Sequence, residues 1–84
     1  MENHILKYHR NRKGTPRGVV VATENGIGWS LCRKTDRFSK RTGVNIAFDR
    51  ANNPESKRLA IPSSLTKEFL NMEGRRKHYF KLED

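Results

Sequence analysis

Two strand-forming segments flank an Asn-Gly pair in the stretch VVVATENGIGWSLC, residues 19–32. Asn25-Gly26 is the pair best suited to the two positive φ angles of a type I′ turn, which joins antiparallel strands through a two-residue loop. With that loop, Ala22 faces Trp29 across the strand pair. The stretch therefore predicts a β-hairpin, and the rest of the fold is built outward from it.

The two faces of this hairpin differ in character, because side chains alternate between the faces of a strand. One face collects most of the large apolar side chains and is the expected core face: Val20, Ala22, Ile27, Trp29 and Leu31. The other face carries smaller residues: Val19, Val21, Thr23, Gly28, Ser30 and Cys32. A face this flat allows another backbone or a partner to approach closely.

A third strand is expected at residues 5–8, joined to the hairpin by the turn-rich residues 11–16. A first helix is predicted from an N-cap at Asp36 to about residue 52, where Asn53-Pro54 ends it. The apolar residues of this helix lie on the same side as the basic residues of a turn near its start, and these basic residues cannot all be buried. Either that turn projects beyond the core, or Gly43 breaks the helix and Phe38 packs separately.

A second helix is predicted over residues 64–80, opened by a serine N-cap after Pro62. Gly74 leaves an alternative, in which the helix ends there and residues 77–82 form an edge strand. Together these elements predict a single small basic α+β domain over residues 1–84. Its small antiparallel sheet, a hairpin with an N-terminal third strand, packs against two C-terminal helices.

Composition limits what so small a domain can do. The chain has 84 residues, of which 33% are hydrophobic and 32% charged, so its core must be thin and a deep enzymatic cavity is not expected. No apolar run approaches the roughly 20 residues that cross a bilayer. Residues 1–4 lack the apolar core of a secretion signal. We therefore expect a cytoplasmic protein that makes no membrane contact.

Residue types that carry chemistry are few and scattered. His4, His9 and His78 lie far apart in the sequence, without the spacing of a metal site. Cys32 has no partner for an internal disulfide and is expected to be a small apolar filler in a reducing compartment. The glycine-containing turns lack the rest of a phosphate-binding fingerprint. We expect no metal, no cofactor, no catalytic residue and no enzymatic activity.

Charge is the strongest functional signal. The chain carries 18 Lys and Arg against 9 Asp and Glu, a net charge of +9, and residues 1–17 and 33–50 each contribute +4. Lysine and arginine bind a polyphosphate backbone by releasing its condensed counterions. We predict a nucleic-acid-binding surface made of Arg10, Arg12, Lys13, Arg17, Arg33, Lys34, Arg37, Lys40 and Arg41. These clusters merge if the first loop lies over the hairpin end near residue 33.

A wider pattern carries a resemblance. Residues 26–32, GIGWSLC, are followed by Asp36-Arg37-Phe38, Lys40, Gly43, Ile46-Ala47 and Arg50-Ala51. This pattern resembles a family of small uncharacterised proteins of tailed bacteriophages, and the resemblance covers residues 18–51 best. It implies expression in the cytoplasm of an infected bacterium, where small basic phage proteins commonly bind nucleic acid or a host factor. It transfers no site and no activity.

The leading hypothesis is a non-enzymatic module that contacts phosphates of DNA or RNA with little readout of the bases. The alternative is a phage-encoded inhibitor or adaptor that binds an acidic host protein or a defence nucleoprotein, through the flat hairpin face. Charge would then steer association, while apolar anchors such as Trp29 or Phe38 supplied affinity.

A third hypothesis is a small ribonuclease similar to bacterial toxins of this size and charge. Its acid and base candidates are His78 and Tyr79, beside Arg76 and Lys77. The order of elements, strands before helices, departs from that of those toxins.

Overall fold

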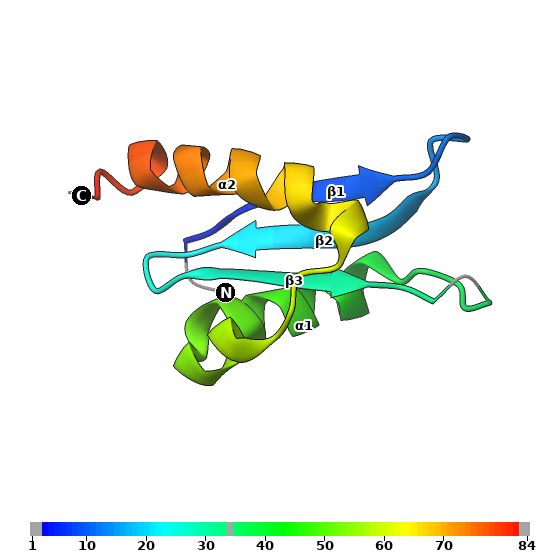
Figure 1. Cartoon of the computed structure of the whole chain (residues 1–84), viewed down its shortest axis with the longest axis horizontal. Helices are drawn as coiled ribbons and strands as arrows, with labels where there is room; N and C mark the ends of the chain where they lie inside the picture. The colour runs from blue at the N-terminus through cyan, green and yellow to red at the C-terminus, as the bar shows by residue number, and fades with distance from the viewer. Residues whose placement is uncertain (1–2, 34, 83–84) are drawn as a thin grey trace.

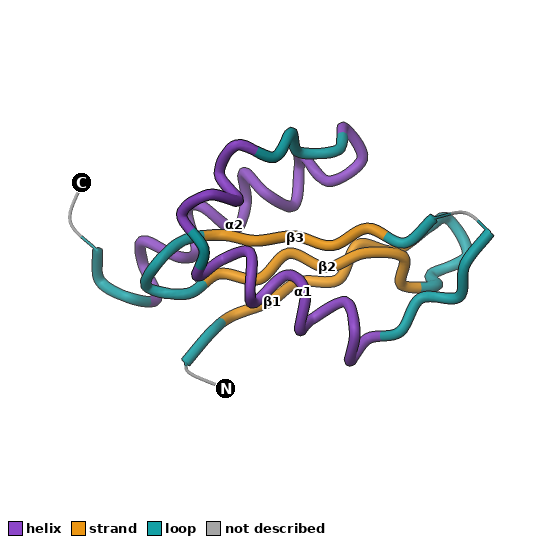
Figure 2. Tube along the Cα trace, turned by 90° about the horizontal axis from the view of Figure 1, so that it is seen from below, coloured by secondary structure: helices purple, strands orange, loops and turns teal. Residues whose placement is uncertain are grey.

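The computed structural model describes residues 3–33 and 35–82. Three antiparallel strands, β1 (Ile5–Arg10), β2 (Pro16–Ala22) and β3 (Ile27–Leu31), form a sheet in the order β1-β2-β3. Helix α1 (Lys40–Asn52) covers one face of the sheet and helix α2 (Thr66–Tyr79) covers the other (Figures 1 and 2). The predicted α+β fold, with its third strand and two helices, is confirmed.

The hairpin loop differs from its prediction. Ala22 lies opposite Ile27 and Val20 opposite Trp29, so the connection has four residues, 23–26, instead of two. The type I′ turn is wrong, because the positive φ angles among the described residues belong to Gly14 and Lys81. The pairing moves by two residues, which leaves every side chain on its predicted face.

Contacts with α1 explain the longer loop. The Thr23 hydroxyl accepts a hydrogen bond from the Asn25 backbone N–H at 3.1 Å and donates to Asn52 Oδ1 at 2.8 Å. The Asn25 side chain donates to the same oxygen of Asn52 at 3.0 Å. These bonds fix the loop to the last turn of α1. The length of the loop therefore depends on a residue outside the hairpin sequence.

Both faces of the sheet are buried. Val20 and Ala22 pack with Met72 and Phe69 of α2, on the face predicted to be the core. The flat face packs against α1 through a second cluster that contains Val19, Val21 and Ala47. A partner protein therefore does not reach this face, and that part of the inhibitor hypothesis is wrong because the helix backbone occupies it.

Helix α1 begins later than predicted. Ser39, not Asp36, is its N-cap, and the Ser39 hydroxyl accepts from the Thr42 N–H at 3.3 Å. Gly43 does not break the helix. It is buried under the Phe38 ring, whose carbons would lie 2.8 Å from a Cβ at this position. Phe38 thus packs from the preceding loop, and the basic first turn of the helix projects beyond the core as an exposed segment.

The connector that follows α1, residues 53–61, and helix α2 bring two further corrections. Two 3-10 helices, η1 (Pro54–Arg58) and η2 (Ser63–Leu65), lie between the long helices. No serine side chain caps α2, because the completely buried Leu65 occupies its N-cap position. Gly74 lies within the helix, so the alternative of an edge strand after it is wrong. No helix among the described residues has the length and apolar character needed to cross a bilayer.

A histidine–carboxylate contact fastens β1 to α2. His9 Nδ1 lies 2.7 Å from Glu68 Oε2, and these side chains are 24% and 15% exposed. Burial alone would raise the pKa of Glu68. The hydrogen bond with His9, a backbone hydrogen bond and the charges of His9 and Lys7 outweigh it, so the pKa lies below its ordinary value of 4.5. The ionised carboxylate is therefore favoured by folding.

This contact predicts a pH-dependent stability. A carboxyl group whose pKa is lowered by folding stabilises the fold above its unfolded pKa, and this contribution is lost as the pH falls through the folded pKa. We expect Glu68→Gln to lower the melting temperature near pH 7, and the difference from the wild type to shrink as the pH falls below 4.5. Thermal unfolding followed by circular dichroism across this pH range measures it. A difference that is the same at every pH would contradict the assignment.

Candidate nucleic-acid interface

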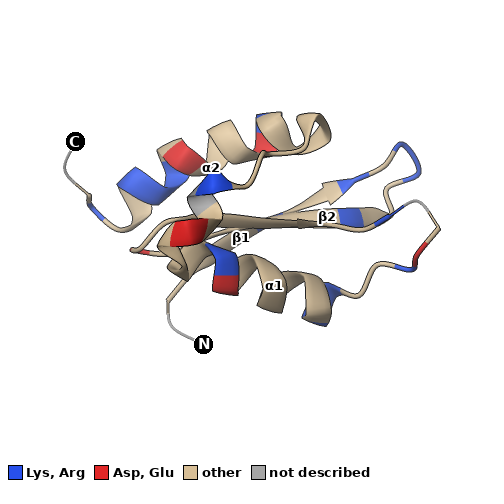
Figure 3. Ribbon diagram, turned by 60° about the horizontal axis from the view of Figure 1, so that its bottom comes forward, with Lys and Arg blue, Asp and Glu red and all other residues tan. Residues whose placement is uncertain are grey.

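Three basic segments meet at one end of the sheet. They are the β1–β2 turn with its flanks, the loop of residues 32–39, and the first turn of α1 (Figure 3). We call this region the basic end. Its described cations are Arg10, Arg12, Lys13, Arg17, Arg33, Arg37, Lys40 and Arg41. Lys34, the ninth predicted residue, lies outside the described residues, and Asp36 is the acidic residue described within the region.

Arg17 joins the two basic clusters. Its guanidinium donates to the Asp36 carbonyl at 2.9 Å and also to the Arg33 carbonyl. The Cys32 N–H donates to the Arg17 carbonyl at 2.8 Å, which extends the β2–β3 pairing past the end of β3. The loop that carries Arg33 is thereby held against the beginning of β2. These contacts also explain why Asp36 lies in a turn instead of capping the helix.

Tyr8 brings cations from β1 and α1 to one aromatic ring. The Lys40 ammonium lies 4.9 Å from the ring centroid, and the Arg10 guanidinium carbon lies 5.9 Å from it. The Phe38 ring meets Tyr8 edge-on, with 6.3 Å between centroids. Tyr8 is half-buried at the edge of the α1-side core. Cation–π attraction therefore holds two charges together that mutual repulsion would separate.

The β1–β2 turn has a fixed shape. Asn11 Oδ1 accepts from the N–H groups of Lys13 and Thr15, each at 3.0 Å. Gly14 takes the left-handed conformation at a φ of 82°, and the Arg10 guanidinium donates to its carbonyl at 2.9 Å. An Asx turn of this kind replaces backbone hydrogen bonds that a flexible loop would give to water. The exposed side chains in this turn are thus presented on an ordered backbone.

Charge in the basic end is not neutralised internally. Within the described residues, none of its lysines or arginines forms an ion pair. The described acidic residues other than Asp36 lie elsewhere, on the hairpin loop, the later turns of α1, the connector and α2 (Figure 3). The net positive charge is thus concentrated at one end of a molecule about 40 Å long, because the nine Lys and Arg elsewhere in the sequence are nearly balanced by eight Asp and Glu. A field of this sign and asymmetry attracts polyanions.

The other residues weighed for chemistry lie apart from the basic end or serve packing. His78 and Tyr79 occupy the C-terminal turn of α2, which lies at the opposite end of the molecule (Figure 1). The half-buried Cys32 thiol donates to the Asp36 carbonyl at 3.2 Å and so supports the 32–39 loop. Among the described residues, no three His, Cys, Asp or Glu side chains are grouped as a metal site would require.

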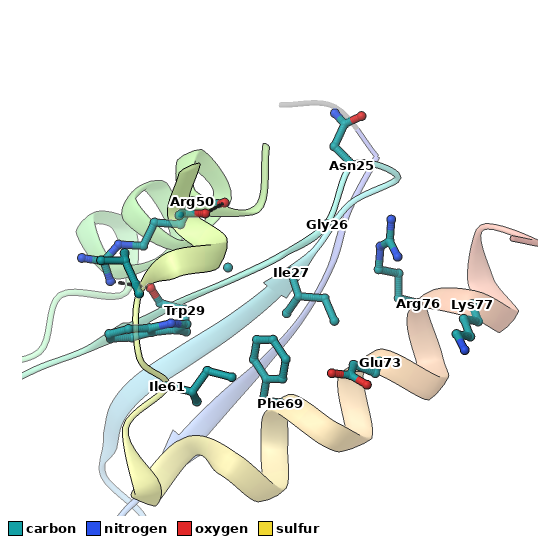
Figure 4. Close-up of a pocket in the computed structure, with 13 residues that line it drawn as sticks. Asn25, Gly26, Ile27, Trp29, Arg50, Ile61, Phe69, Glu73, Arg76 and Lys77 are labelled. Carbon is teal, nitrogen blue, oxygen red and sulfur yellow. Dashed lines mark hydrogen bonds between the residues drawn. The ribbon is translucent and has the colours of Figure 1, made fainter. Parts of the chain in front are cut away.

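Sequence reasoning missed a second feature, a groove beside β3 (Figure 4). Arg50 reaches round the edge of this strand, places its guanidinium carbon 4.6 Å from the Trp29 ring centroid, and donates to the Trp29 carbonyl at 2.9 Å. The available sequence signal was the presence of Leu59 and Ile61 in an otherwise polar connector. Their common position over an open strand edge depends on the tertiary fold.

Comparison of the chain with models of protein families, with curated proteins and with solved structures found no match. The geometry and charge of these two surfaces therefore indicate the function.

Proposed function

We propose that this protein binds nucleic acid without catalysis, through contacts between the basic end and backbone phosphates. The observation that carries the proposal is the convergence of three basic segments, fastened by Arg17, with no internal carboxylate pairing their cations among the described residues. Lysine and arginine at such a density release counterions from a nucleic acid when they bind it. In line with the resemblance to tailed-phage proteins, we place this binding in the cytoplasm of an infected bacterium.

The cations have different roles in this proposal. Arg12, Lys13, Arg37 and Arg41 are exposed and make the phosphate contacts. Arg17 positions the 32–39 loop, since its guanidinium is already bonded to two backbone carbonyls. Ordered turns reduce the conformational entropy that binding must remove, which favours affinity for a flexible backbone.

We expect this protein to recognise few base edges of the nucleic acid. The cations lie on turns and at the start of a helix, and no described helix presents a row of them for insertion into a major groove. Phosphate contacts fix position without carrying sequence information. We therefore expect unrelated sequences, and both DNA and RNA, to bind with similar affinity.

Binding to fluorescein-labelled duplex DNA, single-stranded DNA and single-stranded RNA of unrelated sequences tests the proposal. We expect the logarithm of the association constant to fall linearly with the logarithm of salt concentration, measured by fluorescence anisotropy between about 50 and about 300 mM salt. Four phosphate contacts give a duplex slope of roughly −3.6, at about 0.9 per contact. Absence of binding at the lowest salt, or an affinity that salt leaves unchanged, would refute the proposal.

A further inference from the structure

The outer edge of β3 has backbone groups that are free to pair. The hydrogen bonds from the Thr23 N–H to the Gly26 carbonyl and from the Cys32 N–H to the Arg17 carbonyl fix the alternation of the β2–β3 ladder. By this alternation, Ile27 and Trp29 point their N–H and C=O groups away from β2. In the described chain, only the Trp29 carbonyl among these has a partner, which is Arg50. Such an edge can template a further strand.

A groove of about 400 Å³ lies along this edge (Figure 4). Phe69 and Glu73, one turn apart on α2, line one side, and Leu59 and Ile61 of the connector also contribute to the lining. Leu59 is 45% exposed and Ile61 is 38% exposed. The fold thus holds two incompletely buried apolar side chains over a strand edge whose backbone is available for pairing.

Charge identifies the kind of occupant. The lining includes the cations Arg50, Arg76 and Lys77 against the single carboxylate of Glu73. Arg50 lies beside Trp29 near one end of the groove, and Arg76 lies beyond Ile27 toward the other (Figure 4). The Arg76 guanidinium is bonded to the Thr23 carbonyl at 2.6 Å and to the Glu24 carbonyl, so it contributes positive charge at a fixed position and not a new hydrogen bond. An apolar middle between cationic ends matches an extended segment with acidic and apolar residues.

We propose that this groove binds an extended acidic segment of a partner protein, which adds to the edge of β3 as a short strand. Its backbone pairs with the free groups of Ile27 and with the Trp29 N–H, its apolar side chains contact the connector and Phe69, and its carboxylates face the cations. The groove is separate from the basic end. One small domain thereby connects a protein partner to a nucleic acid.

Trp29 provides the readout, because it is the only tryptophan in the chain and lines the groove. The probe is a synthetic heptapeptide with aspartates at both ends and valines between them, and its controls are the same peptide with lysine for aspartate and the same peptide with N-methylated amides. We expect the acidic peptide to change Trp29 emission saturably, and the lysine peptide to bind at least about tenfold more weakly. The N-methylated peptide should not bind, because it cannot donate to the Ile27 carbonyl.

Two matched variants locate the binding. Leu59→Asp places a negative charge at the groove, whereas Leu70→Asp places it on α2 outside the lining, at a residue that is 61% exposed. We expect Leu59→Asp to weaken binding of the acidic peptide by at least about tenfold and Leu70→Asp to leave it unchanged. Ile61→Asp, at the other exposed apolar residue, repeats the groove test with a second variant. Circular dichroism melts identify variants that remain folded.

The outcomes distinguish peptide binding at the groove from nucleic-acid binding at the basic end. We expect Leu59→Asp to retain the wild-type salt dependence of nucleic-acid binding, so either proposal can fail alone. No saturable response to the acidic peptide, binding of the N-methylated peptide, or equal losses in the folded Leu59 and Leu70 variants would overturn strand addition. Loss of oligonucleotide binding in the folded Leu59→Asp variant would assign the groove to nucleic acid and overturn it as well.

Discussion

Gly28→Ala is expected to destabilise the domain by on the order of 3 kcal/mol or more, because the new methyl group has no space. A Cβ at this position would lie 1.9 Å from the Ala47 carbonyl oxygen and 2.4 Å from the Ala51 amide nitrogen. Both are backbone atoms of α1, so no side-chain rotation relieves the overlap. The helix would have to move away from the sheet and loosen the cluster around Val19 and Val21. A domain of this size has few kcal/mol in reserve.

Gly74→Ala is the matched control. Position 74 is exposed in the middle of α2, and nothing lies within 4 Å of its Cβ position. Alanine favours a helix over glycine by roughly 0.5 to 1 kcal/mol, so this variant should be slightly more stable than the wild type. Urea unfolding followed by circular dichroism gives both changes in free energy. If Gly28→Ala unfolds at the same urea concentration as the wild type, the close packing of α1 on β3 is wrong.

The hairpin shows how far local sequence determines this fold. Alternation along the strands correctly placed Val20 and Trp29 on one face and Val19 and Gly28 on the other. The length of the loop could not be predicted in the same way. It depends on Asn52, more than 25 residues later, which binds the Thr23 hydroxyl. A two-residue shift of the β2–β3 pairing leaves each side chain on the same face but changes the type of turn.

The start of α1 could not be predicted from local sequence either. Asp36 and Ser39 are both good N-cap residues, and their local sequences do not rank them. Arg17 decides between them, because its bonds to the carbonyls of Arg33 and Asp36 hold the earlier residues in a turn. The Arg17–Asp36 contact spans 19 residues and joins two segments that the sequence presents only as separate basic clusters.

The two candidate surfaces differ in how far they could be predicted from the sequence. Each of the cations now described at the basic end could be named from charge alone, but their convergence depends on three chain segments that meet at one end of the sheet. The groove could not be named, because an open strand edge and the position of the connector are properties of the assembled fold. The role of Trp29 changes accordingly, from an expected core residue to one shared by the α2-side core and the groove.

Reversing three charges at the basic end is expected to have the largest effect on nucleic-acid binding. Arg12, Arg37 and Arg41 are all exposed, and Arg41→Glu places an acidic residue in the first turn of α1, where a helix tolerates it well. The triple variant Arg12→Glu, Arg37→Glu, Arg41→Glu should therefore fold. We expect it to lose three phosphate contacts and to bind all sequences more weakly.

A control triple variant separates these contacts from net charge. Arg58→Glu, Lys67→Glu and Arg75→Glu also reverse three exposed cations, on the connector and α2. Each reversal removes two units of charge, so both variants go from +9 to +3. Long-range attraction falls to a similar extent in the two proteins, and only the phosphate contacts of the basic end distinguish them.

The most direct measurement is the salt dependence of duplex DNA binding for the wild type and both triple variants, by fluorescence anisotropy on one labelled duplex. Binding at the basic end predicts a slope smaller by about 2.7 units for Arg12→Glu, Arg37→Glu, Arg41→Glu, at roughly 0.9 per contact, and a nearly unchanged slope for the control. Equal slopes in the two variants would contradict binding at the basic end, because its cations would then affect DNA binding only through the net charge of the protein.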